Sequence, residues 1–408
     1  MKKRFPLQRL LPVYVAVLVT LPWIYLRFAG FAGGPPEEAL LAGLCIVGAA
    51  FLLAWASELA NLEISASLAV AILALVAVLP EYAVDMYFAW QAGKDPTYAH
   101  YAVANMTGSN RLLIGVGWTA VMFLYWWKTR KRILHLGPSD RLELGALTFA
   151  TVYAMSIPFR GNLSLIDTAV LITLFVFYIR AASRQAVEVP HLVGPSETLA
   201  RLPRRSRRLL TIGMFVYAAG AILISAEAFA EGLIGTGKLF GIDEFFLVQW
   251  LAPLASEAPE FIVAFLFALQ GRANIGLRAM ISSKVNQWTL LIGMLPLAYS
   301  ISAGHLGAMN FDARQVQEVL LTVAQSFFAI AVLAKLDFSV GAAGVLVTLF
   351  FAQFFAPALH GVFAGIYFAL GALILVTYPE RLKTLAQSVG AVFGYQPRAK
   401  RGRAGQRG

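Results

Sequence analysis

Hydrophobic stretches of roughly 18 to 30 residues follow one another along almost the whole chain, each long enough to cross a hydrocarbon core as a helix. The short alternating segments typical of membrane β-barrels do not occur. The pattern predicts an all-α, multi-pass membrane protein with about twelve spans, at 11–30, 38–57, 65–91, 97–127, 142–159, 163–180, 209–232, 244–269, 274–302, 316–334, 338–355 and 358–378.

Composition supports the same class of protein. Hydrophobic residues make up 59% of the 408 residues and charged residues only 13%, which excludes an ordinary water-soluble domain. The single cysteine, Cys45, excludes an intrachain disulfide. The basic residues that precede the first span also fit the start of a signal peptide, so cleavage of that segment stays open as an alternative.

The net charge of +11 is distributed unevenly between the loops. With the N-terminus placed on the cytoplasmic side, 25 of the 33 Lys and Arg residues fall on that side, mainly in 1–11, 128–141, 180–208 and 379–408. This asymmetry predicts a protein of the cell (inner) membrane with both termini in the cytoplasm. The basic clusters are expected to lie near anionic lipid headgroups of the bilayer, and a nucleic-acid partner is not expected.

Two hydrophobic hairpins share a motif that places an acid within a predicted span. Pro80-Glu81 opens one motif and Pro259-Glu260 opens the other, and the residues that follow match in type. An acid at bilayer depth costs a few kcal/mol and is usually functional. Proline removes one helical hydrogen bond, so we expect each motif to combine a kinked helix, free carbonyl oxygens and a carboxylate.

The duplication predicts the organisation of the chain. The first hairpin turns on the outer side near 93–96 and the second on the inner side near 271–272, so the two halves are expected to be inverted five-helix repeats. The expected segments are an N-terminal segment with one extra span (1–37), the first repeat (38–183), a basic cytoplasmic linker (184–208), the second repeat (209–356), and an extra span with a basic tail (357–408).

These motifs resemble those of a known family. Leu-Pro-Glu at 79–81 and Ala-Pro-Glu at 258–260, followed by Gly-Ser-Asn at 108–110 and Ser-Ser-Lys at 282–284, are similar to the two alpha repeats of the sodium/calcium exchanger family. That family belongs to the calcium/cation antiporter superfamily, and this chain resembles a divergent member. The resemblance implies a secondary-active cation antiporter with alternating access around a midplane site that contains the paired glutamates.

The resemblance and the local spacing together define a candidate site. Asp85 lies four residues after Glu81, on the same face of a helix. Several positions depart from the family pattern, above all Lys284, which stands where the family has an amide. The candidate cation ligands are Glu81, Glu260, Asp85, Glu257, Ser109, Ser256, Ser283 and Asn110, and Lys284 is expected to compensate their charge.

Other interpretations of these residues remain open at this stage. Glu81 and Glu260 also fit buried carboxyls at a broken helix, and Asp85 and Glu257 also fit an outer shell of the site. Lys284 also fits a side chain that reaches a membrane interface. Three more positions stay undecided: Arg111 is expected to pair with Asp85 or a headgroup, and Asn105 and Asn286 fit either ligands or helix packing.

The predicted function is cation antiport, with Ca²⁺, Na⁺ or H⁺ as the transported ions. The loss of hydroxyl and amide ligands relative to the family pattern favours proton coupling over sodium coupling, because the Lys284 ammonium can stand in for a sodium ion. The same losses leave an alternative open, namely a membrane sensor or partner subunit that has kept the fold without transport. We expect neither an enzyme nor a bound cofactor, and the sequence does not predict an oligomeric state.

Overall fold

The computed structural model describes residues 7–30, 33–62, 78–185 and 192–394. It is almost entirely helical, as the sequence predicts. The main helices are α1 (Leu11–Phe28), α2 (Pro35–Ala60), α4 (Leu79–Ala92), α5 (Ala99–Leu112), α6 (Thr119–Thr129), α7 (Arg141–Ala154), α8 (Ser156–Arg160), α9 (Leu165–Ala182), α10 (Pro195–Leu199), α11 (Arg204–Phe240), α12 (Glu244–Leu269), α13 (Ala273–Asn286), α14 (Ile292–Ala303), α15 (Ala313–Leu333), α16 (Val340–Phe355), α17 (His360–Thr377) and α18 (Glu380–Val392).

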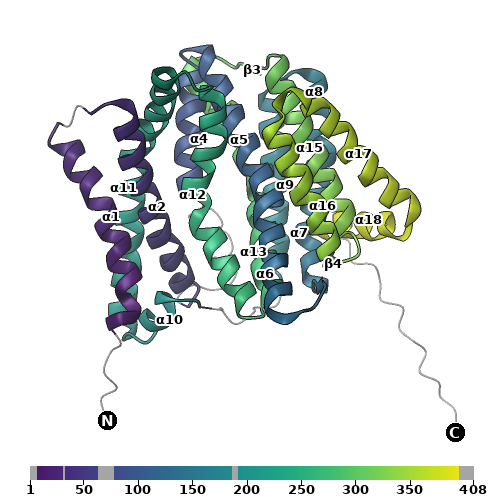
Figure 1. Cartoon of the computed structure of the whole chain (residues 1–408), viewed down its shortest axis with the longest axis horizontal. Coiled ribbons are helices and arrows are strands. Elements are labelled where there is room, and N and C mark those ends of the chain that lie inside the picture. Colours follow the sequence, from purple (N-terminus) through teal and green to yellow (C-terminus); the bar gives the residue numbers. More distant parts are fainter. Residues whose placement is uncertain (1–6, 31–32, 63–77, 186–191, 395–408) are drawn as a thin grey trace, which may run out of the picture.

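The long helices stand side by side in one bundle, with α1 at one edge and α17 at the other (Figure 1). Within the described residues, eight helices are long and apolar enough to cross a membrane. The predicted spans 97–127 and 274–302 each form a rod that continues through a π-helical segment, at Leu113–Trp118 and Gln287–Leu291. Part of the predicted span 65–91 lies outside the described residues.

Two small antiparallel sheets show how the halves of the chain are related. β1 (Ile133–His135) pairs with β4 (Asp337–Ser339), and β2 (Asn162–Leu163) pairs with β3 (Met309–Asn310). β1 and β3 each follow the π-containing rod of their own half. β4, the partner of β1, nevertheless lies at the opposite end of the bundle from β3 (Figure 1). A twofold rotation about an axis in the plane of the membrane would exchange the two halves and would also exchange the two sheets, as expected for inverted repeats.

Close helix contacts hold the two repeats together at the level of the motifs. A Cβ atom at Gly108 on α5 would lie 1.8 Å from the carbonyl oxygen of Gln249 on α12, so only glycine allows the two backbones to touch here. This contact joins α5 of the first repeat directly to the helix that carries the second Pro-Glu motif. The residues that follow Gly108 are thereby fixed against the opposite repeat.

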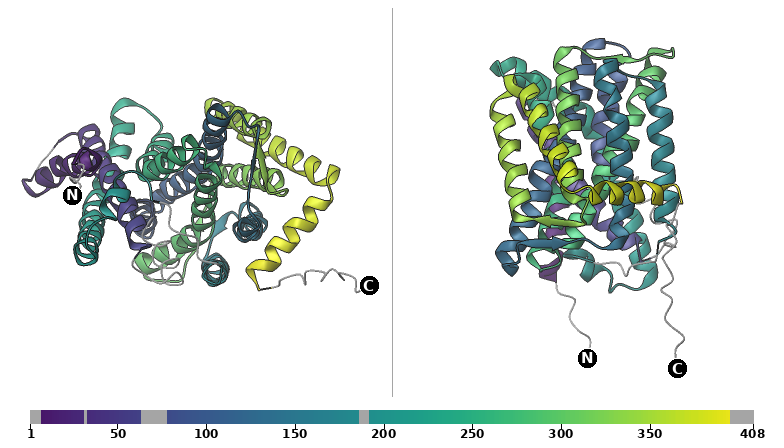
Figure 2. Two further views of the ribbon diagram at one scale, coloured as in Figure 1. Left: turned by 90° about the horizontal axis from the view of Figure 1, so that it is seen from below. Right: turned by 90° about the vertical axis from the view of Figure 1, so that its right-hand side faces the viewer.

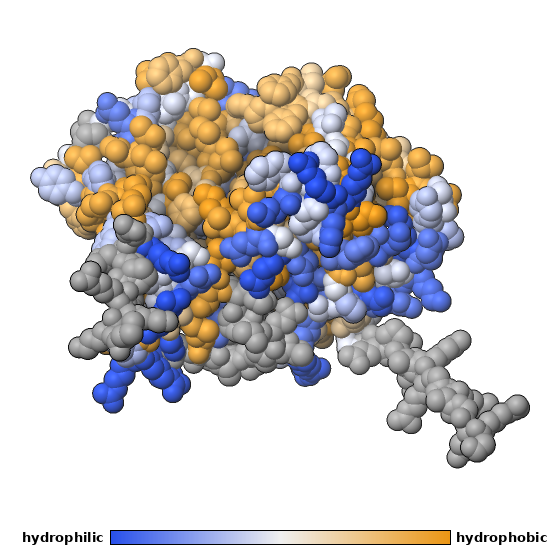
Figure 3. Space-filling model, turned by 60° about the horizontal axis from the view of Figure 1, so that its bottom comes forward, coloured by the Kyte–Doolittle hydropathy of each residue, from blue (hydrophilic) through white to orange (hydrophobic). Residues whose placement is uncertain are grey.

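The outside of the bundle is apolar, as the membrane interpretation requires. On α11 the exposed side chains Leu209, Ile212, Val216 and Leu223 form a stripe with exposed fractions of 59% to 72%. Hydrophilic residues gather at the end of the bundle that comes forward in Figure 3, and hydrophobic residues cover the sides behind it. A bundle with apolar sides and a polar end is expected when lipid surrounds its middle.

The segment after the last span differs from the prediction. Sequence analysis describes 357–408 as one extra span and a basic tail, but the structure adds α18, which runs across the other helices (Figure 2). Its apolar residues recur at helical spacing, and Leu385, Ser388 and Val392 are buried against the bundle. Mean hydropathy does not reveal such a helix, because its polar face lowers the average.

Candidate cation site

The four predicted acids come together from two helices, one in each repeat. Glu81 and Asp85 lie on α4, and Glu257 and Glu260 lie on α12. Glu81, Asp85 and Glu257 are only 3%, 0% and 2% exposed. The negative charge of Glu81 is repelled by those of Asp85 and Glu260, which lie nearby. The charge of Glu257 is likewise repelled by those of Glu81 and Glu260. The glutamates of the two motifs therefore meet inside the bundle.

Gln287 links the two repeats at the centre of this acidic cluster. Its side-chain Nε2 donates to Glu81 Oε2 at 2.9 Å and to Glu257 Oε1 at 3.0 Å. Gln287 begins the π-helical segment after α13, where the local change in helical winding directs the side chain between the acids. Gln287 is not among the candidate ligands predicted from the sequence, and its bridging role was missed.

Several oxygens in the cluster have no hydrogen-bond partner within the described part of the chain. These buried atoms are Glu81 Oε1, Asp85 Oδ1 and Oδ2, Glu257 Oε2 and Gln287 Oε1. Buried carboxylates without a partner are very costly unless a proton or a cation neutralises them. Among the described residues, however, no three His, Cys, Asp or Glu side chains form a ready-made metal cluster. Any cation held here must also draw on amide, hydroxyl or backbone oxygens.

Lys284 lies entirely within the bundle, so the alternative that it reaches a membrane interface is wrong. Its Nζ donates to Asn110 Oδ1 at 2.7 Å and to the Asn110 carbonyl at 3.2 Å, and it lies 4.2 Å from the centre of the Trp288 ring. The ammonium also interacts with the charges of Glu257 and Glu81. A fixed positive charge therefore lies beside the acids, held by the first repeat and the tryptophan.

The remaining predicted ligands differ in how they are used. Ser283 Oγ donates to Glu260 Oε2 at 2.5 Å, so this serine belongs to the acidic cluster. Ser109 lies beside Glu81, although its hydroxyl donates to the Met106 carbonyl at 3.2 Å. Ser256 donates instead to carbonyls of its own helix, at 3.1 and 3.3 Å.

Two of the amide side chains near the site, those of Asn110 and Asn286, have hydrogen-bond partners. Asn110 donates through Nδ2 to the Met106 carbonyl at 2.7 Å, and its Oδ1 receives the Lys284 ammonium. The Asn110 amide oxygen thus binds the tethered ammonium in the position proposed for a free cation. Asn105 lies beside Asp85, and Asn286 accepts a hydrogen bond from Tyr82 at 3.0 Å.

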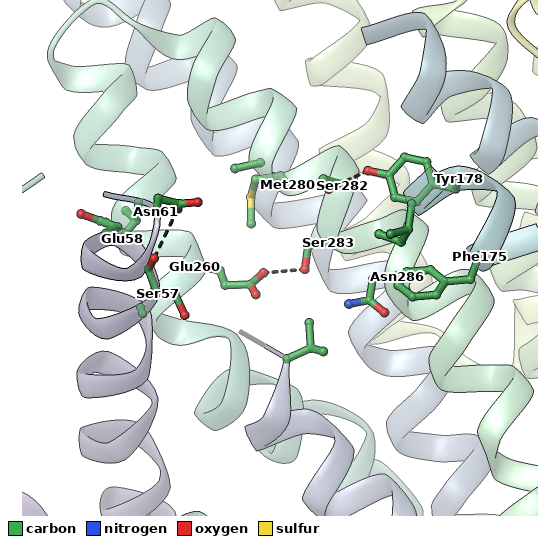
Figure 4. Close-up of a pocket in the computed structure, with 15 residues that line it drawn as sticks. Ser57, Glu58, Asn61, Phe175, Tyr178, Glu260, Met280, Ser282, Ser283 and Asn286 are labelled. Atoms are coloured by element: carbon green, nitrogen blue, oxygen red, sulfur yellow. Dashed lines mark hydrogen bonds between the residues drawn. The ribbon is translucent and has the colours of Figure 1, made fainter. Parts of the chain in front are cut away.

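A cavity of about 420 Å³ reaches the acidic cluster from one side. Figure 4 shows Glu260 pointing toward Ser283 in this cavity, with Ser57, Glu58 and Asn61 of the α2 end opposite. Glu81, Asp85 and Glu257 do not line it. One acid therefore faces the cavity while the other three are enclosed by the bundle.

The prolines do not act in the same way. Pro80 lies in the first turn of α4, where a missing amide hydrogen costs nothing. Pro259 lies within α12, which continues from Glu244 to Leu269 without a break. Pro259 withdraws one hydrogen bond from an otherwise intact helix.

The expectation that Arg111 pairs with Asp85 or with a headgroup is wrong. Its Nη2 lies 2.6 Å from Glu318 Oε2, and both side chains are almost completely buried. His360 Nδ1 lies 3.0 Å from the other Glu318 oxygen, and Gln249 donates to Glu318 at 2.9 Å. This polar network ties α5 and α12 to α15 and α17. It neutralises Arg111, so Arg111 contributes little positive charge to the acidic cluster.

Substitution of Glu318 by Gln is expected to destabilise the fold. The change leaves the buried guanidinium of Arg111 without a counter-charge, and breaking one partner of a buried ion pair costs about 3–5 kcal/mol. The measurement is the melting temperature of the purified protein in detergent. The control is Asp243→Asn, which removes the exposed pair with Arg314 and should cost at most about 1 kcal/mol. Equal losses in the two variants would contradict the assignment.

Two further acids accept hydrogen bonds that connect separate segments of the chain. Glu58 accepts hydrogen bonds from the Val193 amide and from Ser196, which attaches the end of α2 to α10. Glu231 on α11 accepts from the hydroxyls of Tyr87 and Tyr98, at 2.7 and 2.8 Å. Glu227 is exposed.

Comparison with known proteins supplies an independent view of the chain. A family model described as sodium/calcium exchanger protein matches residues 39–183 and 210–359. The crystal structure of the H⁺/Ca²⁺ exchanger CAX is similar with a TM-score of 0.90 and 42% sequence identity, over 95% of this chain and 98% of that chain.

More distant matches agree in fold. The Ca²⁺/H⁺ antiporter YfkE is 16% identical, with a TM-score of 0.60 over 83% of this chain and 99% of that chain. The sodium-calcium exchanger NCX_Mj is 14% identical, with a TM-score of 0.54 over 79% and 98%. The sodium/calcium exchanger MaX1 of Methanosarcina acetivorans is 30% identical over 91 residues, which are 22% of this chain and only 26% of that relative.

Proposed function

Since this chain belongs to the sodium/calcium exchanger protein family, we propose that it is a secondary-active antiporter that exchanges Ca²⁺ for protons across the cell membrane. The observation that carries the proposal is the acidic cluster formed by Glu81, Asp85, Glu257 and Glu260 inside the bundle. The 42% identity to an H⁺/Ca²⁺ exchanger over nearly the full length of both chains supports the choice of ions.

The charges of the cluster explain why it would bind either Ca²⁺ or protons. With all four acids ionised and Lys284 protonated, the cluster has three uncompensated negative charges in a low-dielectric interior. A divalent cation removes two of them, and two protons remove the same number. Either Ca²⁺ or two protons leave a single negative charge, whereas both together would leave a net positive charge. Binding of one ion therefore displaces the other, which is the requirement for antiport.

Lys284 supports proton coupling over sodium coupling. The Lys284 ammonium already donates to the amide oxygen of Asn110. The site therefore contains a monovalent cation that is covalently attached to the protein. A tethered ammonium cannot leave with the substrate and cannot carry a sodium gradient. The exchangeable monovalent charge is then left to the carboxyl groups, which bind protons.

The cavity supports a conformation that is open toward the cytoplasm. It lies at the ends of α2 and α9 on the side of the bundle where α1 begins (Figure 1). We place this side in the cytoplasm because the loops that the sequence predicts on it contain most of the Lys and Arg residues. Glu260 would then receive ions from the cytoplasm, and movement of the helices around the cavity would expose the cluster to the other side.

The test is Ca²⁺ uptake into proteoliposomes under imposed gradients. Uptake is expected to follow an outward proton gradient and to disappear when a protonophore collapses it. An outward Na⁺ gradient at equal pH is expected to drive no uptake. Uptake driven by Na⁺ alone would overturn proton coupling. Absence of flux under both gradients, with Ca²⁺ still raising the melting temperature, would favour a membrane sensor or partner subunit instead.

A further inference from the structure

We propose that the chain has a specific binding site for one anionic phospholipid, in a pocket between α7, α9 and α18. The pocket has a volume of about 750 Å³ and is lined on its polar side by Arg141, Arg180 and Arg184. It is separate from the acidic cluster and involves neither repeat motif. The last residues that line it, 391–394, lie beyond the segments that the family model matches.

The three arginines lack a counter-charge within the described part of the chain. None of them forms an ion pair there, and the described residues that line the pocket include no acid. All three side chains are exposed. Three guanidinium groups around one cavity repel each other and favour an anion between them. Arginine presents paired N–H donors that match the oxygens of a phosphate group.

The apolar side of the pocket indicates that the anion carries an acyl chain. Phe177 and Phe393 line the pocket while staying 40% and 47% exposed, and their ring centres lie 5.4 Å apart. The same two rings line a second cavity of about 260 Å³. Apart from Thr173, that cavity is lined only by apolar side chains, namely Phe149, Ala169, Val170, Leu174, Phe177 and Phe393.

The position in the fold places these two cavities at the boundary between headgroups and hydrocarbon. Arg141 begins α7 and Arg180 lies in the last turn of α9, so the basic side lies at the ends of two spans. The apolar cavity extends along the outer side of α9 toward the middle of the bundle. A glycerophospholipid has the same order of parts, with an anionic phosphate at the helix ends and an acyl chain along the helix.

α18 completes the site and is held firmly in place. A Cβ atom at Gly145 on α7 would lie 2.0 Å from the carbonyl oxygen of Ser388, so glycine permits α18 to pack directly on α7. Arg381 donates to the carbonyls of Ala331 and Val332 near the end of α15. The crosswise direction of α18 in Figure 2 is typical of helices that lie in a membrane interface.

The test compares lipid retention by the full-length protein in native mass spectrometry. Phosphatidylglycerol is expected to stay bound in preference to phosphatidylcholine, as a single molecule per chain. Each arginine near the membrane surface contributes about a fivefold change in binding, so Arg180→Gln with Arg184→Gln should weaken phosphatidylglycerol binding about 30-fold. The matched control is Lys128→Gln with Arg130→Gln, two exposed charges at the end of α6. That control should retain the lipid.

Two further arms separate a lipid from other anions. Val170→Trp fills the apolar cavity while leaving the arginines in place, and it should weaken long-chain phosphatidylglycerol about tenfold more than a short-chain form. Soluble glycerol phosphate should not displace the lipid. Equal losses in the Arg180/Arg184 variant and in the Lys128/Arg130 control would show diffuse attraction by the basic surface and overturn the site. Displacement by glycerol phosphate would overturn the lipid and indicate a free phosphate ligand.

Discussion

Substitution of Glu81 by Gln is expected to abolish Ca²⁺ flux while leaving the fold intact. Gln287 donates to Glu81 Oε2, and an amide oxygen at the same position can accept the same hydrogen bond. The substitution therefore removes a charge and not a structural contact. Even loss of an outer-shell partner weakens a metal site by about 10–100-fold, so loss of a central carboxylate should reduce flux by more than about 100-fold.

The measurement is Ca²⁺ uptake by proteoliposomes under a proton gradient, together with the melting temperature in detergent. Glu260→Gln should give the same loss because Glu260 is the acid that faces the cavity. Glu227→Gln is the matched control, because the Glu227 side chain is 59% exposed and its salt bridge to Arg27 is long at 3.9 Å. Undiminished flux in either cluster variant would remove the acidic cluster from the transport mechanism.

The features predictable from the sequence are those that depend on local pattern. Apolar runs of spanning length predicted the helices, and the span predicted at 244–269 has the bounds of α12. The duplicated Pro-Glu motif predicted that Glu81 and Glu260 meet, because an inverted repeat brings equivalent positions to a common axis. Both inferences need only the periodicity of the chain and the cost of an acid in a membrane.

The features that escaped prediction depend on partners that are remote in the sequence. Gln287 and Glu81 are 206 positions apart, and Arg111 and Glu318 are 207 apart. A buried polar side chain takes whichever partner tertiary packing brings to it, and no local pattern encodes that choice. The sequence signal that was overlooked is Glu318 itself, a lone acid in the predicted span 316–334 that requires a basic partner.

Substitution of Lys284 by Asn is expected to make the protein respond to sodium. The ammonium builds a positive charge into the acidic cluster, where it interacts with Glu257 and Glu81. Asn removes this charge and introduces an amide oxygen, so a monovalent cation gains both electrostatic attraction and a ligand. A bound ion stabilises by about 2.7 kcal/mol at 100 times its Kd. Na⁺ should therefore raise the melting temperature of the variant and not of the wild-type protein.

Two neighbouring variants separate the effect of charge from the effect of oxygen ligands. Lys284→Arg keeps the positive charge and should stay insensitive to Na⁺. Lys284→Met removes the charge without adding an oxygen, so it should bind Na⁺ more weakly than the Asn variant. Both neutral variants remove the ammonium that donates to Asn110. Any local disturbance from that loss is therefore the same in the two variants. If Lys284→Asn still binds Ca²⁺ but ignores Na⁺, the ammonium of Lys284 does not substitute for a sodium ion.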